Sequence, residues 1–256
     1  MKSGIVSRTL CVLTLATAPF GFGGTVGSPQ APVFFEPNRG QFDPNVRFVG
    51  RMSDVPVGLF ADGVGFETPA RAGGAAGPIR MRFLGMDTKA RWAGLLSSPG
   101  VSNYLTSTST VTSVERFQKA RMNGVYPGID VELHGSGAKI EYDFIVHPGA
   151  DPARIRYKVE GTPVRLDRQG NLLIAAGDYE LGNRTPELYQ ERNGVKTPVQ
   201  GHFILRGTTV SFAVGAYDKQ QTLVIDPVIF AKLLSPTGSF SWASSATTDS
   251  AGNVYV

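Results

Sequence analysis

The sequence predicts an all-β protein, an antiparallel, β-sandwich-like domain built from many short strands and hairpins. The 256 residues include 31 Gly and 17 Pro spread along the chain, which is typical of many short turns. Apolar and polar residues alternate over short segments, as in IRMRF from Ile79, and this is the period of a half-buried strand. We find no long segment with the apolar stripe of an amphipathic helix. The hydrophobic content of 41% is enough to bury a sizeable core.

The N-terminal segment has the order of a secretory signal. Lys2 and Arg8 precede an apolar run from Leu10 to Ala16, and small residues follow. The run is shorter than the roughly 20 residues of a spanning helix, so we expect no membrane span. We therefore assign residues 1–28 to a signal peptide and spacer and expect a protein that is secreted or at the cell surface. Cys11 is the only cysteine and lies within this segment.

The strands and hairpins are expected between residues 30 and 229. Turn residues such as Asp62-Gly63 and Asn193-Gly194 separate alternating runs, which predicts hairpins. In chain order, the expected strand-bearing segments are PVFFEPNRGQFDPNVRFVGR, VGLFADGVGFET, IRMRF, ERFQKARMNGVY, GIDVELHGSGAKIEYDFIV, RIRYKVEG, VRLDRQGNLLIAAG, PELYQERNGVKTPVQGHFIL and TVSFAVGAYDKQQTLVIDPVIF. The sequence thus predicts one large β-rich domain.

The segment GIDVELHGSGAKIEYDFIV, from Gly128, places four carboxylates on one hairpin. A turn centred on Ser136-Gly137 sets apolar residues on one face, with Ile129, Val131 and Leu133 opposite Phe144, Tyr142 and Ile140. On the other face it sets Asp130 opposite Asp143, Glu132 opposite Glu141 and His134 opposite Lys139. Like charges directly opposite each other are destabilising, so we expect them to be neutralised.

Two basic strands are candidates for this neutralisation. If strands 117–122 and 154–160 flank the hairpin in a meander, their cations project onto the acidic face. This predicts a structural ion-pair face formed by Asp130, Glu132, Glu141, Asp143, Lys119, Arg121, Arg154, Arg156 and Lys158. Two alternatives stay open, namely a calcium site formed by Asp130, Glu141 and Asp143 and a plain solvated face.

The chain carries no recognisable catalytic or cofactor motif. The three histidines lie in different predicted hairpins without metal-ligand spacing, and GxSxG, P-loop and GxGxxG motifs do not occur. We therefore expect no enzyme activity and no cofactor apart from the calcium alternative. The net charge is +4, and the cations alternate with acids along the chain, which argues against a nucleic-acid partner. Candidate sugar-stacking aromatics are Trp92, Tyr104, Tyr126 and Tyr189.

Four segments together resemble a known family. EPNRGQ, VYPGIDVELHG, IEYDFIVHPGADPARI and AYDKQQTLVIDPVIF are similar, in this order, to the N-terminal domain of unknown function that precedes SBBP-type β-propeller repeats in secreted bacterial proteins. The resemblance runs from about Phe34 to Ile229. The tail SSATTDSAGNVYV resembles the opening strand of the first repeat, so residues 230–256 are expected to begin a truncated β-propeller repeat. A single blade fragment cannot bury its own face, and we expect the chain after Pro236 to lack a strand partner.

These observations favour a non-catalytic exported module with an extracellular or cell-surface recognition or structural role. The resemblance implies a β domain in a propeller context and supplies no catalytic residues. The expected partners are an unknown extracellular protein or glycan and the chain's own C-terminal propeller. The alternative function is a polysaccharide-binding or polysaccharide-active protein that uses the aromatic residues and the acidic hairpin.

Overall fold

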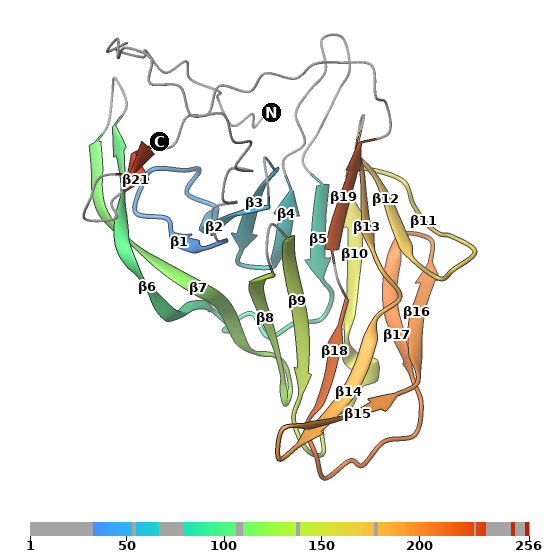
Figure 1. The fold of residues 1–256 in the computed structure, drawn as a ribbon. Coiled ribbons are helices and arrows are strands. Elements are labelled where there is room, and N and C mark those ends of the chain that lie inside the picture. The colour runs from blue at the N-terminus through green and yellow to red at the C-terminus, as the bar shows by residue number, and fades with distance from the viewer. Residues whose placement is uncertain are drawn as a thin grey trace, which may run out of the picture.

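The computed structural model describes residues 33–52, 55–66, 79–105, 110–136, 139–176, 179–227, 229–233, 247–248 and 254–255. These residues form β-strands and one 3-10 turn, η1 (Pro152–Arg154), without an α-helix (Figure 1). The all-β prediction is confirmed. No helix in the described ranges is long and apolar enough to cross a bilayer. The predicted signal peptide and spacer, residues 1–28, lie outside the described residues.

The strands follow one another closely along the chain, as the dense turn residues predict. Their bounds are β1 (Phe35–Pro37), β2 (Val46–Met52), β3 (Val55–Phe60), β4 (Gly63–Phe66), β5 (Ile79–Phe83), β6 (Trp92–Leu105), β7 (Thr110–Tyr126), β8 (Ile129–Ser136), β9 (Lys139–Val146), β10 (Arg156–Glu160), β11 (Val164–Leu166), β12 (Leu172–Ala176), β13 (Tyr179–Asn183), β14 (Glu187–Arg192), β15 (Val195–Val199), β16 (Gly201–Arg206), β17 (Thr209–Val214), β18 (Leu223–Asp226), β19 (Ile229–Leu233), β20 (Thr247–Thr248) and β21 (Val254–Tyr255).

One large sheet contains most strands and is nearly closed. The long strand β7 pairs with β6 along one edge and with both β1 and β8 along the other. From β1 the first limb runs through β2, β3, β4, β5, β10, β17 and β16. From β8 the second limb runs through β9, β18, β14 and β15. A separate four-stranded sheet has the order β11-β12-β13-β19.

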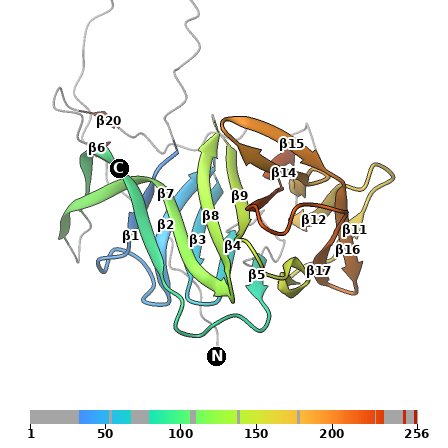
Figure 2. The same cartoon turned by 90° about the horizontal axis from the view of Figure 1, so that it is seen from below.

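The core lies between the two limbs, whose strands face each other in the view of Figure 2. Phe144 of β9 makes edge-on ring contacts with Phe83 of β5 and Phe212 of β17. The hydroxyls of Tyr142 and Tyr157 lie 3.1 Å apart across the same space, and both side chains are buried. Burial of such rings is the main source of stability in a β domain.

The apolar face of the β8–β9 hairpin points into this core, as predicted, but the predicted register is wrong by two residues. Val131 pairs with Phe144 and Glu132 pairs with Asp143. The ladder ends at the pair Ser136–Lys139, so its centre is one residue later than Ser136-Gly137. Because side chains alternate with a period of two, this shift preserves each face and changes only the partners. His134 consequently pairs with Glu141, Asp130 with Ile145, and the predicted pairs Asp130–Asp143 and Glu132–Glu141 do not form.

The prediction that strand 154–160 flanks the hairpin is also wrong. After β9, η1 carries the chain to the opposite limb, where β10 pairs with β5 and β17. The second neighbour of β9 is β18, which comes from much later in the chain. Arg154 lies in η1 and not in a strand, while Arg156 and Lys158 lie in β10.

The C-terminal strands join both sheets. β19 pairs with β13, so residues 230–233 extend the four-stranded sheet beyond the expected boundary at residue 229. β20 pairs with β21, and β21 pairs in parallel with β6. The expectation that the chain after Pro236 lacks a strand partner is therefore wrong for these described strands. The division into domains and the propeller repeat stay predictions.

Candidate functional site

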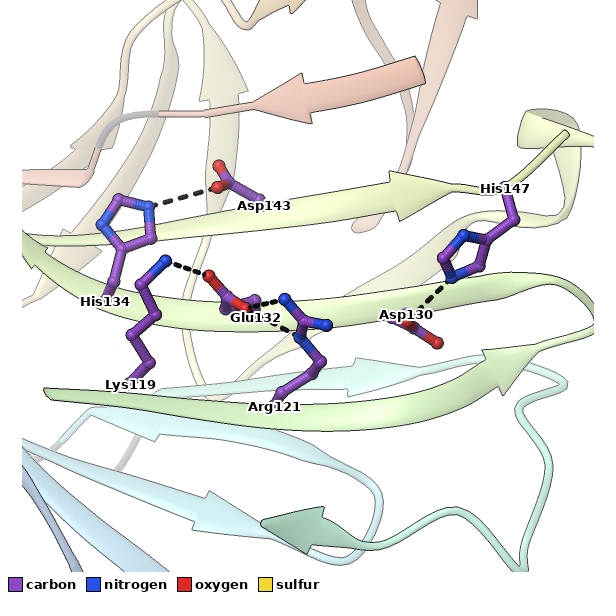
Figure 3. Close-up of polar contacts among 7 residues, drawn as sticks. All are labelled: Lys119, Arg121, Asp130, Glu132, His134, Asp143 and His147. Atoms are coloured by element: carbon purple, nitrogen blue, oxygen red, sulfur yellow. Dashed lines mark hydrogen bonds and ion pairs between the residues drawn. The ribbon is translucent and has the colours of Figure 1, made fainter. Parts of the chain in front are cut away.

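The acidic outer face of the hairpin consists of Asp130 and Glu132 on β8 with Glu141 and Asp143 on β9. Figure 3 shows three of these carboxylates, those of Asp130, Glu132 and Asp143, with their partners. The four residues alternate with the apolar residues that point into the core, and this alternation puts all four on the opposite side of the sheet. They are nevertheless largely covered, since Glu132 is only 2% exposed and Asp130 only 8%. Buried carboxylates require partners, which the neighbouring strands provide.

Glu132 is held by two cations from β7. Lys119 Nζ donates to Glu132 Oε1 at 2.6 Å, and Arg121 Nε donates to Oε2 at 2.7 Å, with a second guanidinium nitrogen on the same oxygen. Burial raises the pKa of Glu132, but the hydrogen bonds and charges of the two cations outweigh it, so the pKa is lowered overall. Glu132 is thus a charged group that links β8 to β7 through its ion pairs with Lys119 and Arg121.

Asp130 is engaged separately from the rest of the face. Its Oδ1 accepts a hydrogen bond from the backbone N–H of Gly124 at 2.7 Å, and its Oδ2 lies 2.9 Å from His147 Nε2. Gly124 has φ of 63°, and it lies where the pairing of β7 with β8 shifts between Met122 and Tyr126. Asp130 therefore fixes a bulge in β7.

His134 lies against the other two carboxylates. Its Nε2 lies 3.2 Å from Asp143 Oδ2, and its Nδ1 lies 3.9 Å from Glu141 Oε2. The hydrogen bond with Asp143 raises the pKa of His134, which favours the protonated ring. Sequence reasoning treated His134 and His147 as isolated histidines and missed both contacts. For His134, its place on the acidic face of the hairpin was the available signal.

Asp226 joins this face from β18 and was also missed from the sequence. The ladder between β18 and β9 ends at the pair Ile225–Phe144, and Asp226 follows directly, close enough to feel the charge of Asp143. Asp226 also pairs with Glu187 on β14. Burial raises the pKa of Asp226 to about 7, and the nearby charges of Asp143 and Glu141 contribute. The Oδ1 atoms of Asp143 and Asp226 are buried and accept no hydrogen bond from the described residues.

The remaining candidate cations lie elsewhere. Arg154 is exposed in η1, and Arg156 lies in β10 on the opposite limb. Lys158 pairs with Glu160 of its own strand at 3.5 Å. Of the five predicted cations, Lys119 and Arg121 therefore do contact the acidic outer face, whereas Arg154, Arg156 and Lys158 do not, and the other contacts of the face are made by two histidines.

The calcium candidates do not form a cluster. Within the described ranges, no three or more His, Cys, Asp or Glu side chains are grouped so that they could hold a metal ion. Asp130 is turned to Gly124 and His147, whereas Glu141 and Asp143 face His134.

Two of the four candidate stacking aromatics are core residues. Trp92 is 8% exposed and Tyr126 is 2% exposed, and each donates a hydrogen bond to a backbone carbonyl. Their selection as sugar platforms was wrong. Tyr104 and Tyr189 are partly exposed, and the ammonium of Lys196 lies 3.8 Å from the centre of the Tyr189 ring.

Comparison with known proteins gives a family but no relative of known activity. No curated protein and no solved structure matches the chain. Residues 35–228, which include the whole acidic outer face and both limbs of the large sheet, match the family described as Domain of unknown function (DUF7948). This match covers well over half of the sequence, and the chain therefore belongs to the DUF7948 family.

Proposed function

We propose that this chain is a non-catalytic module of an exported protein, with a structural or recognition role outside the cytoplasm. The observation that supports a non-catalytic role is the environment of the Glu132 carboxylate. Both of its carboxylate oxygens bind cations, its side chain is buried, and its pKa is lowered. Such a carboxylate has no proton to donate at neutral pH and no free oxygen for a substrate, so it is suited to holding strands together.

Export is supported by the basic start, apolar run and small residues of segment 1–28. The resemblance to domains that precede SBBP-type repeats supports a secreted or cell-surface location and a propeller context. In this proposal, residues 30–229 form a β-sandwich-like domain and residues 230–256 begin a propeller repeat. The partners are an extracellular protein or glycan and the chain's own propeller.

A hydrolysis assay over a panel of polysaccharides, together with a glycan array, tests the non-catalytic role. We expect no hydrolysis by the purified chain. Hydrolysis that Glu132→Gln abolishes without unfolding the protein would overturn the proposal. N-terminal sequencing tests export, since an intact Met1 found only in the cytoplasm contradicts it.

Glycan recognition without catalysis is the second candidate, and it is favoured by one surface feature. An open hollow of about 440 Å³ is lined by Asn38, Gly40, Phe42, Pro44, Val46 and Arg47. The aromatic ring of Phe42 and the guanidinium of Arg47 are groups that bind sugars, whereas the Asn38 amide is engaged by backbone groups of its own loop, and none of the six residues is acidic. Glycan-array binding that Phe42→Ala and Arg47→Ala each reduce supports this candidate, whereas binding unchanged by both variants excludes the hollow.

A further inference from the structure

The outer face of one limb of the large sheet carries several cations. Strands β5, β10, β17 and β16 follow one another in this limb (Figure 1). Their alternate residues, such as Met81, Tyr157 and Phe212, are buried in the core, so the residues between them point outward. The charged residues at outward positions are five cations and one carboxylate, namely Arg80, Arg82, Arg156, Lys158, Arg206 and Glu160. We call this surface the basic outer face.

Three of the cations lie at one level of the sheet. Lys158 of β10 pairs with Arg82 of β5 on one side and with Thr209 of β17 on the other. Thr209 in turn pairs with Arg206 of β16. Since neighbouring strands are about 4.8 Å apart, this row spans roughly 14 Å. Like charges directly opposite each other, as in the pair Lys158–Arg82, lower stability, and local rules of this kind are broken mainly at functional sites.

Carboxylates compensate only part of the positive charge. Glu160 accepts a hydrogen bond from Arg82 at 2.9 Å and lies 3.5 Å from Lys158 Nζ. Asp62, in the turn before β4, forms an ion pair with Arg80 at 2.7 Å. Five cations against these two carboxylates leave the surface with a net charge of +3.

Two cations of the basic outer face stay available. Arg156 and Arg206 are exposed, and neither forms an ion pair with a residue that the structure describes. Their hydroxyl neighbours are on β17, where Ser211 pairs with Arg156 and Thr209 pairs with Arg206. A guanidinium offers several N–H donors in a fixed plane and binds carboxylate or sulfate oxygens in pairs, while a hydroxyl both donates and accepts.

The acidic outer face of a second copy does not provide the missing anions. Glu132 is buried and already binds Lys119 and Arg121 of its own chain. Asp130 is buried as well. The partner of the basic outer face is therefore a different anionic molecule.

The other groups of the surface favour a sugar polymer over a nucleic acid or a lipid. The aromatic rings of β5, β10, β17 and β16 are in the core, and the Arg80 guanidinium lies 3.7 Å from the centre of the nearby Phe60 ring. No free ring is thus offered for stacking on bases. None of the exposed large apolar side chains in the described ranges belongs to these four strands, so the surface has no group that inserts into a bilayer.

We infer that the basic outer face binds an acidic polysaccharide, a sugar polymer that carries carboxylate or sulfate groups. Arg156 and Arg206 bind its anionic groups, and the hydroxyls of β17 between them bind its hydroxyls. An extended polymer that lies along the row meets cations on β5, β10 and β16. This inference goes beyond the proposed function, because the hollow at Phe42 belongs to none of these strands and either surface binds without the other.

Binding of the full chain to polygalacturonate and to heparin, with neutral dextran as the reference, tests the inference. The first polymer carries carboxylates and the second mainly sulfates, so the tighter complex identifies the preferred anion. We expect the double variant Arg156→Gln, Arg206→Gln to bind that polymer about ten-fold more weakly at low salt. Glu160→Gln removes the carboxylate from the row and should bind about three-fold more tightly, a gain that a merely perturbed fold does not produce.

The double variant Arg168→Gln, Arg192→Gln is the matched control. It removes the same charge from exposed residues outside the four strands, and its affinity should stay within about two-fold of the wild type. Urea unfolding shows that the variants remain folded. The inference is overturned if neither acidic polymer binds, if dextran binds equally well, or if the two double variants lose affinity equally.

Three further results would assign the binding elsewhere and also overturn the inference. The first is a loss of polymer binding in Phe42→Ala alone, which would place the polymer in the hollow. The second is tighter binding of a single-stranded DNA oligomer that depends on Arg156 and Arg206. The third is the same dependence for vesicles of phosphatidylserine and phosphatidylcholine in equal parts, with no binding of either polymer.

Discussion

Replacing Asp226 with Asn should remove a pH-dependent loss of stability. Asp226 pairs with Glu187 on β14 and lies close to Asp143 on β9, and Glu141, His134 and Lys196 are further charged groups near it. Burial, reinforced by these carboxylates, raises its pKa from 3.8 to about 7. The native state therefore keeps a proton that the unfolded state releases above about pH 4. Stability from this group is complete below that pH and is lost as pH rises through about 7.

The size of the effect follows from the shift. A shift of about 3 pKa units corresponds to at most about 4 kcal/mol. Because Asp226 is only partly buried, solvent screening reduces this to about 1 to 2 kcal/mol. The Asn side chain has the shape of the protonated acid but cannot ionise. We expect Asp226→Asn to match the wild type near pH 3.5 and to exceed its free energy of unfolding at pH 8.5 by about 1 to 2 kcal/mol.

Urea unfolding at a series of pH values measures this difference. Asp218→Asn is the matched control, because a backbone amide and the Gln221 side chain lower the pKa of Asp218. The same chemical change should therefore bring no gain at pH 8.5. The reasoning is refuted if Asp226→Asn keeps the pH dependence of the wild type or is less stable than it at pH 8.5.

Three further predictions concern single residues. His134→Gln should lower the melting temperature at pH 5.5 and leave it nearly unchanged at pH 8.5, because a raised pKa stabilises the fold only while the ring is protonated; the opposite dependence contradicts the ion pairs. Gly201→Ala should destabilise the protein by about 1 to 3 kcal/mol in urea unfolding, since a Cβ there would lie 2.9 Å from the carbonyl oxygen of Ala213. Trp92→Phe should cost about 1 to 3 kcal/mol by removing the 2.7 Å hydrogen bond to the carbonyl of Phe60, and an unchanged stability would argue against its buried position.

The faces of the central hairpin could be predicted from the sequence, whereas the partners could not. The alternation of apolar and polar residues identifies Val131 and Tyr142 as core residues. This holds in every hairpin register that differs from the true one by an even number of residues. The same property leaves the opposite residue undetermined, so Glu132 was assigned to Glu141 and in fact pairs with Asp143. Local pattern thus determines burial, and the turn determines register.

The neighbours of the hairpin depend on long-range pairing, which local pattern does not encode. Lys119 and Arg121 precede the hairpin directly in an antiparallel strand, so adjacency in sequence predicts their contact with Glu132. On the other side, adjacency points to β10, but η1 leads that strand to the opposite limb and β18 brings Asp226 instead. The local sequence of the hairpin therefore gives no indication that a carboxylate so far along the chain will lie beside it.

A double-mutant cycle on Arg121 and Glu132 tests the central claim that the acidic outer face holds the fold together. Arg121→Gln, Glu132→Gln and the double variant are unfolded in urea at neutral pH. The buried, charged hydrogen bonds between the two side chains predict a coupling free energy of about 1 to 2 kcal/mol. The claim would be contradicted if the losses in the free energy of unfolding of the two single variants sum to that of the double variant within about 0.5 kcal/mol. That result would show that the ion pair between Arg121 and Glu132 does not stabilise the fold.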